Sequence, residues 1–144
     1  MVKVEGSMRK RAGVIVYNEK EKTIVLIKRI KIGQTYWVIP GGGVEDFETE
    51  KEAAIREMSE ELGIKIIDDV HFQKVFSFEN HVYYLFKTDY KHDLKIIGEE
   101  KYRNANDNQY LLSWVKTDAI LGLNILPSGL KKKLISFIDV MNKE

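Results

Sequence analysis

The sequence contains no cysteine and only three histidines among its 144 residues. Disulfides and thiolate metal sites are therefore excluded, and a metal site would have to use mainly oxygen ligands. No apolar run is long enough to span a bilayer, and the N-terminal MVKVEGSMRKR lacks the apolar core of a signal peptide. The net charge of +1 gives no general electrostatic case for binding nucleic acid or an acidic membrane. We therefore expect a cytoplasmic protein that does not bind membranes and for which nucleic acid is not the expected partner.

The composition is that of an ordinary globular protein, with 44% hydrophobic and 31% charged residues. A chain of this length suits one domain, which can bury roughly two-thirds of its unfolded surface without disulfide or metal staples. No repeat or low-complexity linker divides the sequence. We expect one domain over residues 1–144, with residues 1–8 forming a flexible or added end.

Short apolar segments, bounded by polar or glycine-rich stretches, predict a series of strands. They cover residues 13–17, 23–27, 36–39, 70–78, 82–88 and 110–115. We expect the first two to form an antiparallel hairpin, and Glu79-Asn80-His81 to form the turn of another. The polar residues 89–108 predict a long loop with a short strand near 94–97, and the spacing of apolar residues over 127–141 predicts a terminal helix. This order indicates a mixed α/β protein with helices packed on a mixed sheet.

The central charged segment carries both start and stop signals of a helix. Thr49 is a favourable N-cap, and Glu52 stands three residues later, which completes a capping box. Gly63 can adopt the left-handed conformation that ends a helix. The sequence therefore predicts a helix from about Glu50 to Leu62.

Three carboxylates share one face of this predicted helix. At the usual rotation per residue, Glu60 and Glu61 lie roughly 60° and 40° to either side of Glu57, while Met58 faces the core. Like charges at these spacings repel, and a helix selected only for stability would alternate them with lysine. A bound divalent cation would remove the repulsion, and oxygen ligands suit Mg²⁺ or Mn²⁺. Because Mg²⁺ usually shares its ligand shell with phosphate oxygens, a diphosphate is the natural partner.

The glycines before the helix extend this hypothesis. Gly41-Gly42-Gly43 follows Pro40 and would let the backbone approach a ligand closely. The main-chain carbonyl of Gly42 could then offer the metal one more oxygen. A phosphate-cradling loop of the P-loop type is a weaker interpretation, because no Gly-Lys-Ser/Thr follows the glycines.

The spacing of these residues resembles the signature box of the Nudix hydrolases. That box is a glycine, five residues, a glutamate, seven residues, Arg-Glu, an aliphatic residue, one residue, Glu-Glu, one residue, glycine and an aliphatic residue. The matching positions run from Gly42 to Ile64 and are Gly42, Glu48, Arg56, Glu57, Met58, Glu60, Glu61, Gly63 and Ile64. Met58 stands where leucine, isoleucine or valine is commoner. The flanking residues 37–41 and the order of the strands are also similar to that family.

The resemblance implies an α/β/α sandwich around a mixed sheet, which hydrolyses a nucleoside diphosphate linked to another group, X, with Mg²⁺. By position, it implies that Glu60 and Glu61 are the principal metal ligands. Glu57 would ligate the metal or act as general base, and Arg56 would orient Glu57 through a charge-assisted hydrogen bond. Glu48 would support the cluster or a second ion.

The resemblance further implies that Gly42 contributes its carbonyl and that a later acidic residue, Glu99 or Glu100, assists. It leaves a homodimer open as the assembly and does not select the substrate. An oxidised nucleoside triphosphate, a nucleotide sugar such as ADP-ribose and a dinucleotide polyphosphate all remain open. A nucleotide sensor without catalysis and an enzyme that processes RNA ends are the alternative functions, and a solvated glutamate-rich helix is the structural alternative.

Several basic residues could contact substrate phosphates. Arg9, Lys10 and Arg11 precede the first predicted strand, where a solvated basic end is the simpler interpretation. Lys28 and Arg29 lead out of the second strand towards the glycines. Four aromatic residues could stack on a base, but each is more simply explained by the core or the sheet surface; they are Tyr36, Phe78, Tyr83 and Tyr110. The histidines show no ligand spacing, and residues 102–104 lie where a loop could cover the leaving group.

Overall fold

The structure, a computed structural model, describes residues 9–90, 92 and 108–143. In chain order its elements are β1 (Arg11–Asn18), β2 (Thr23–Lys31), β3 (Gln34–Val38), β4 (Gly41–Gly43), α2 (Glu50–Leu62), β5 (Gln73–Phe78), β6 (His81–Thr88), β7 (Asn108–Lys116), the 3₁₀ helix η2 (Thr117–Gly122) and α3 (Leu130–Asn142). Within this described part, no helix is both long enough and apolar enough to cross a membrane.

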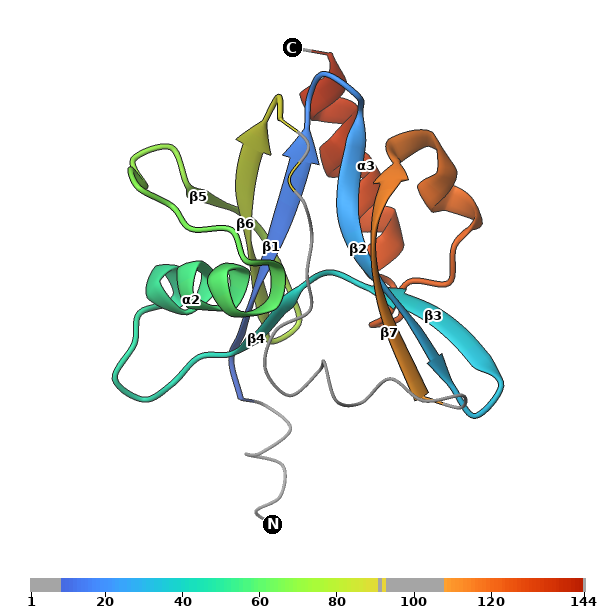
Figure 1. Ribbon diagram of the computed structural model, residues 1–144, viewed down its shortest axis with the longest axis horizontal. Coiled ribbons are helices and arrows are strands. Elements are labelled where there is room, and N and C mark those ends of the chain that lie inside the picture. Colours follow the sequence, from blue (N-terminus) through green and yellow to red (C-terminus); the bar gives the residue numbers. More distant parts are fainter. Residues whose placement is uncertain (1–8, 91, 93–107, 144) are drawn as a thin grey trace.

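The sheet is mixed and consists of two halves that separate from a shared hairpin (Figure 1). In one half, β1 pairs in parallel with β6 along its whole length and antiparallel with the short β4. In the other half, β2 lies between β3 and β7 and is antiparallel to both. β1 and β2 pair only at Tyr17↔Ile24 and Asn18↔Thr23. Beyond these pairs the two strands diverge, so a space opens between the halves.

Helices cover both faces of the sheet, with α2 on one side and α3 on the other (Figure 1). Successive strand residues point to opposite faces, so Val14 of β1 packs in the α2 cluster and Ile15 packs in the α3 cluster. From α2, the buried residues are Ala53, Ala54, Met58 and Leu62. From α3, they are Leu130, Leu134 and Ile138, at the four-residue spacing of one helix face. The predicted α/β/α sandwich is therefore confirmed.

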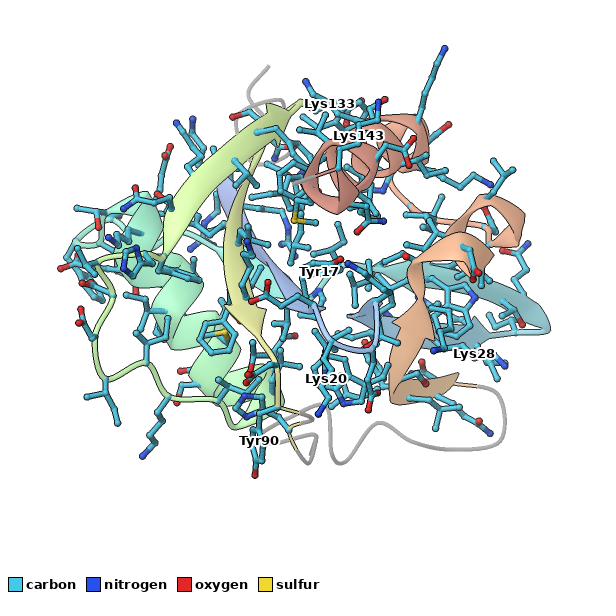
Figure 2. All side chains as sticks on the ribbon, turned by 90° about the horizontal axis from the view of Figure 1, so that it is seen from above. Tyr17, Lys20, Lys28, Tyr90, Lys133 and Lys143 are labelled. Atoms are coloured by element: carbon cyan, nitrogen blue, oxygen red, sulfur yellow. The ribbon has the colours of Figure 1, made fainter. Side chains whose placement is uncertain are left out.

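The opposite ends of the chain also meet in this arrangement. Tyr17, near the middle of Figure 2, donates a hydrogen bond from its hydroxyl to Asn142 at the end of α3. Tyr17 itself is 2% exposed, so its polar tip requires such a partner.

Local signals fix the ends of α2 as the sequence predicts. The Oγ1 of Thr49 accepts from the N–H of Glu52 at 3.1 Å, and a carboxylate oxygen of Glu52 accepts from the N–H of Thr49 at 2.9 Å. At the other end, Gly63 has φ 72° and donates its N–H to the last carbonyls of the helix. The prediction of a helix from Glu50 to Leu62 is confirmed with these bounds.

The glycine-rich stretch after Pro40, which the sequence indicates only as the boundary of a strand, itself forms the short strand β4 (Gly41–Gly43). β4 lies against the beginning of β1, and a Cβ at Gly41 would stand 2.3 Å from the carbonyl oxygen of Ala12. Glycine is needed at this position because the two strands approach each other closely, in addition to any approach of the backbone to a ligand.

Other differences concern the ends of elements. His81 begins β6 and pairs with Arg11, so it is not part of the predicted turn. The terminal helix begins at Leu130, after Gly129 with φ 95°, and not at residue 127. The 3₁₀ helix η2 was not predicted. The predicted short strand at 94–97 lies outside the described residues.

Candidate active site

Arg56 lies at the centre of the acidic cluster and contacts three of its carboxylates. Its Nε and Nη2 donate to the two carboxylate oxygens of Glu48 at 2.6 and 2.8 Å, which is a bidentate pair. Its Nη1 donates to Glu57 at 3.0 Å and to Glu60 at 3.2 Å. Nη2 also donates to the carbonyl of Gly43 at 3.0 Å. One guanidinium thus connects the helix to the segment before it and to β4.

Arg56 and Glu48 each shift the pKa of the other. The hydrogen bonds from Arg56 lower the pKa of Glu48 to about 2, although burial alone would raise it. The same hydrogen bonds raise the pKa of the guanidinium, which is charged in any case. One Glu48 oxygen also accepts from the N–H of Glu45 at 3.0 Å. Both oxygens of Glu48 are therefore engaged, an arrangement that suits support of the cluster better than binding of an ion.

Glu57 is half-buried, and this burial raises the pKa of its carboxyl against the opposing charges of Arg56 and Arg11. Its carboxylate lies directly against the backbone of β4. A Cβ at Gly42 would stand 2.1 Å from one Glu57 oxygen, closer than any side chain could fit. The glycine at the first position of the box therefore leaves room for the carboxylate of Glu57.

The other two glutamates of the cluster point in different directions. One carboxylate oxygen of Glu61 accepts from the N–H of Gly41 at 2.7 Å, so Glu61 also faces β4. The side chain of Glu60 is 60% exposed and meets the cluster through Arg56. The structure therefore brings Glu57 and Glu61 together at the glycine strand and leaves Glu60 at the solvent edge.

The oxygen ligands of this cluster fit a hard divalent cation. In the part of the chain that the structure describes, no three His, Asp or Glu side chains converge as a ready-made cage. Mg²⁺ does not require one, because it commonly takes one or two carboxylates and completes its shell with water and substrate phosphates. Glu57 and Glu61 at the open backbone of Gly41 and Gly42 offer such a partial shell.

A pocket of about 330 Å³ opens beside the cluster, in the space between the two halves of the sheet. It shares Gly41, Gly42 and Glu61 with the acidic cluster. The polar residues that line it elsewhere are Arg11, Arg29, Tyr36, His81, Tyr83 and Tyr110. No sequence pattern predicted this pocket, because its walls come from strands far apart in the chain.

The basic residues before β1 separate into two kinds. Arg9 lies near Glu45 at 3.5 Å and donates to the carbonyl of Val44, and Lys10 lies 3.3 Å from Glu50. Arg11 instead lines the pocket. Glu99 and Glu100, expected to assist, and residues 102–104, expected to cover the leaving group, lie outside the described residues.

A family model described as the NUDIX domain matches residues 7–133. The chain belongs to the NUDIX domain family. The RNA pyrophosphohydrolase of Pelagibacter ubique (strain HTCC1062) is 30% identical to this Nudix chain over 117 residues, 81% of this chain and 68% of that protein. The RNA pyrophosphohydrolase of Ruthia magnifica subsp. Calyptogena magnifica is 38% identical over 64 residues, 44% of this chain but only 34% of that protein. The prediction of a Nudix hydrolase is confirmed at the level of the family.

Solved structures resemble this Nudix chain over nearly its whole length. The MutT protein of Methanosarcina mazei Go1 has a TM-score of 0.61 and 25% identity, covering 94% of this chain and 96% of that one. A C. elegans Ap4A hydrolase has a TM-score of 0.61 and 20% identity, covering 93% and 96%. The second likeness shows the fold alone.

Proposed function

We propose that this protein hydrolyses the diphosphate linkage of a nucleoside diphosphate joined to another group, X, with Mg²⁺ or Mn²⁺. The observation that carries the proposal is the cluster in which Arg56 joins Glu48, Glu57 and Glu60 while Glu57 and Glu61 face the glycine strand. A sensor that only binds nucleotides would have no need of this arrangement.

The ion would be held by Glu60 and Glu61, with the carbonyl of Gly42 as a further ligand, and Glu57 would either complete this set or act as general base. When bound, such an ion neutralises phosphate oxygens and lowers the pKa of an attacking water. Arg56 keeps the carboxylates close together despite their mutual repulsion, and Glu48 fixes Arg56 from the opposite side. Glu48 as a ligand of a second ion stays a prediction.

As general base, Glu57 accepts a proton from the water that attacks one phosphorus of the diphosphate, while the bond from that phosphorus to the bridging oxygen breaks and the other phosphate leaves with that oxygen. Its half-buried carboxylate is fixed by Arg56 at 3.0 Å and lies against Gly42. A fixed acceptor lowers the barrier because its orientation does not have to be found during the reaction. Glu61, one turn further along α2, would serve as a ligand of the ion. The N–H of Gly41 orients its carboxylate.

A second candidate substrate is the 5′ end of an RNA, which also carries linked phosphates. The relatives from Pelagibacter ubique and Ruthia magnifica, both named RNA pyrophosphohydrolases, favour it. The net charge of +1 opposes it, because nucleic-acid binding normally draws on a basic surface. The chemistry at the acidic cluster would be the same in both cases.

The test is product release from a substrate panel, with Mg²⁺ and with chelator. The panel contains a nucleoside triphosphate, a nucleotide sugar, a dinucleoside polyphosphate and a 5′-triphosphate RNA. We expect turnover of at least one member in Mg²⁺ and none with chelator. Tight binding of a nucleotide without turnover would assign the protein to the sensor class instead. Turnover of the RNA alone would replace the small-molecule substrate and keep the mechanism.

A further inference from the structure

Arg29 occupies an unusual position in the pocket between the two halves of the sheet. It pairs with Tyr36 of β3 on one side and with Tyr110 of β7 on the other, and the three side chains all line the pocket. The centre of its guanidinium lies 3.7 Å from the Tyr110 ring centre and 5.6 Å from that of Tyr36. Its Nη2 donates to Asn108 at 3.3 Å. Among the described residues no carboxylate pairs with Arg29, so its charge has no counter-ion there.

Two nitrogens at this pocket lack hydrogen-bond partners among the residues that the structure describes. The Nε of Arg29 and the Nδ1 of His81 are shielded from water and make no hydrogen bond with any described residue. His81 reaches the pocket from the start of β6, where its ring stacks on Tyr83 with an interplanar angle of 5°. Polar atoms that are closed off from water and left unpaired are costly, and native proteins usually explain them by a ligand or a function.

Arg11 adds a second guanidinium at the rim. Its side chain is exposed and makes no hydrogen bond or ion pair with the described residues, whereas Arg9 and Lys10 both have carboxylate partners. Its charge acts both on Glu57 in the acidic cluster and on His81 in the pocket. In the sheet, Arg11 pairs with His81 of β6 on one side and with Gly43 of β4 on the other, so it lies between the pocket and the glycine strand.

We infer that this pocket binds a phosphoryl group of the substrate other than the diphosphate that is cleaved. The inference rests on the proposed function, since it concerns the part of the substrate beyond the scissile bond. Arg29 and His81 would donate to the phosphoryl oxygens, and Arg11 would bind at the rim. Arginine pairs with phosphate through charge-assisted hydrogen bonds, which supplies the missing counter-ion. The near face of Tyr110 is covered by the guanidinium and is closed to a stacking base.

The substrate class follows from this assignment. It is a nucleoside diphosphate derivative that carries a further phosphate as a monoester on one of its sugars. The pocket and the acidic cluster share Glu61, Gly41 and Gly42, so one molecule can occupy both.

The decisive experiment is a titration of the metal-free protein with inorganic phosphate, followed by NMR of the histidine rings. We expect a saturable shift of the His81 ring, with exposed His71 unchanged as the internal control. Arg29→Gln should weaken phosphate binding at least about tenfold, since a hydrogen bond to a charged group is lost. The ammonium of Lys28, a residue labelled in Figure 2, lies 5.7 Å from the Trp37 ring centre. Lys28→Gln is the matched control, because it removes one charge from the same strand at a residue that does not line the pocket. It should leave the affinity within about twofold.

Arg11→Gln, at an exposed rim position, provides a second variant should Arg29→Gln fail to fold; it should weaken binding severalfold. The inference is overturned if phosphate produces no saturable shift of His81, or if Lys28→Gln weakens binding as much as the pocket variants. It is also overturned if an uncharged nucleoside shifts His81 and phosphate does not, which would make the pocket a base site.

Kinetics on matched substrates link the pocket to catalysis. NADP⁺ and NAD⁺ differ by one phosphate, as do coenzyme A and dephospho-coenzyme A, and each contains a diphosphate linkage. We expect kcat/KM to favour the phosphorylated member of a hydrolysed pair by at least about tenfold, a preference that Arg29→Gln removes and Lys28→Gln retains. Equal kcat/KM within every hydrolysed pair would contradict the inference. Failure to hydrolyse any substrate would count against the proposed function, while the phosphate titration would still decide the pocket.

Discussion

At the scale of single residues, the position of Arg56 is determined by what surrounds it. Its guanidinium meets Glu48, Glu57, Glu60 and the carbonyl of Gly43, and it is held most firmly by the bidentate pair with Glu48. Removing Glu48 should loosen Arg56 and, through it, the carboxylates that the proposed mechanism uses. Replacing Glu48 should therefore reduce the stability of the protein as well as its activity, and denaturation measures the first effect.

Glu48→Gln should lower the free energy of unfolding at pH 7 by about 2 kcal/mol, because a hydrogen-bonded charge is replaced by a neutral amide. Urea denaturation measures this change. Glu45→Gln is the control, since Glu45 pairs with Arg9 at 3.5 Å with both side chains about half exposed, and it should cost under about 1 kcal/mol. Equal losses in the two variants would contradict the central place of the Arg56–Glu48 pair.

The pH dependence of stability follows from the same pair. Arg56 lowers the pKa of folded Glu48 from 4.5 to about 2, so between these values the unfolded chain binds more protons than the folded one. The stabilisation is therefore complete above pH 4.5 and is lost as the pH falls towards 2. The unfolding free energy of the parent should fall over this range more steeply than that of Glu48→Gln, as denaturation at a series of pH values would test. Parallel curves would show that Glu48 titrates normally.

Gly42 gives a second prediction for a single residue. A Cβ at Gly42 would overlap the carboxylate of Glu57, so Gly42→Ala must displace it. If Glu57 is the general base as proposed, a displacement of this size should reduce kcat/KM about 100-fold. Gly122→Ala is the matched control, because a Cβ at Gly122 meets no atom within 4 Å and activity should be unchanged. Full activity in Gly42→Ala would argue against the use of Glu57 in its present position.

At the scale of elements, α2 could be predicted from the sequence because its ends are local. Each end of α2 depends only on residues near it in the sequence: the capping box of Thr49 and Glu52 at the start and the left-handed Gly63 at the end. The helix in the structure has the bounds that these signals predict. β4 could not be predicted in the same way. Gly41–Gly43 is a strand only because β1 lies beside it, and that pairing joins distant parts of the chain.

Thr49→Ala tests the helix signal directly. It removes the side-chain oxygen that accepts from Glu52, and loss of an N-cap should cost about 1 kcal/mol of stability. Thr117→Ala is a suitable control, because no side-chain cap hydrogen bond is formed at the start of η2. It should change stability by under about 0.5 kcal/mol in the same denaturation experiment. An equal effect of both substitutions would show that the capping box does not stabilise α2.

At the scale of the whole molecule, the acidic cluster and the pocket differ in how far the sequence reveals them. The residues of the cluster lie on one helix and the segment before it. Their spacing in the sequence therefore forms a recognisable motif, which the family resemblance identifies. The pocket forms where β1 and β2 diverge, and it collects Arg29, His81 and Tyr110 from three strands. Their meeting depends on strand register, which no local pattern contains, and so Arg29 could be considered for phosphate contact but not placed.

If the carboxylates at the glycine strand perform metal-dependent hydrolysis as proposed, kcat/KM should depend strongly on Glu61. Glu50→Gln is the control, because Glu50 lies on the same helix and pairs with Lys10 and Lys74 outside the cluster. With the best substrate of the panel and Mg²⁺, we predict a loss of at least about 100-fold in Glu61→Gln, with the fold intact by circular dichroism. Glu50→Gln should retain the parent activity. Equal kcat/KM in Glu61→Gln and the parent would contradict the proposed mechanism.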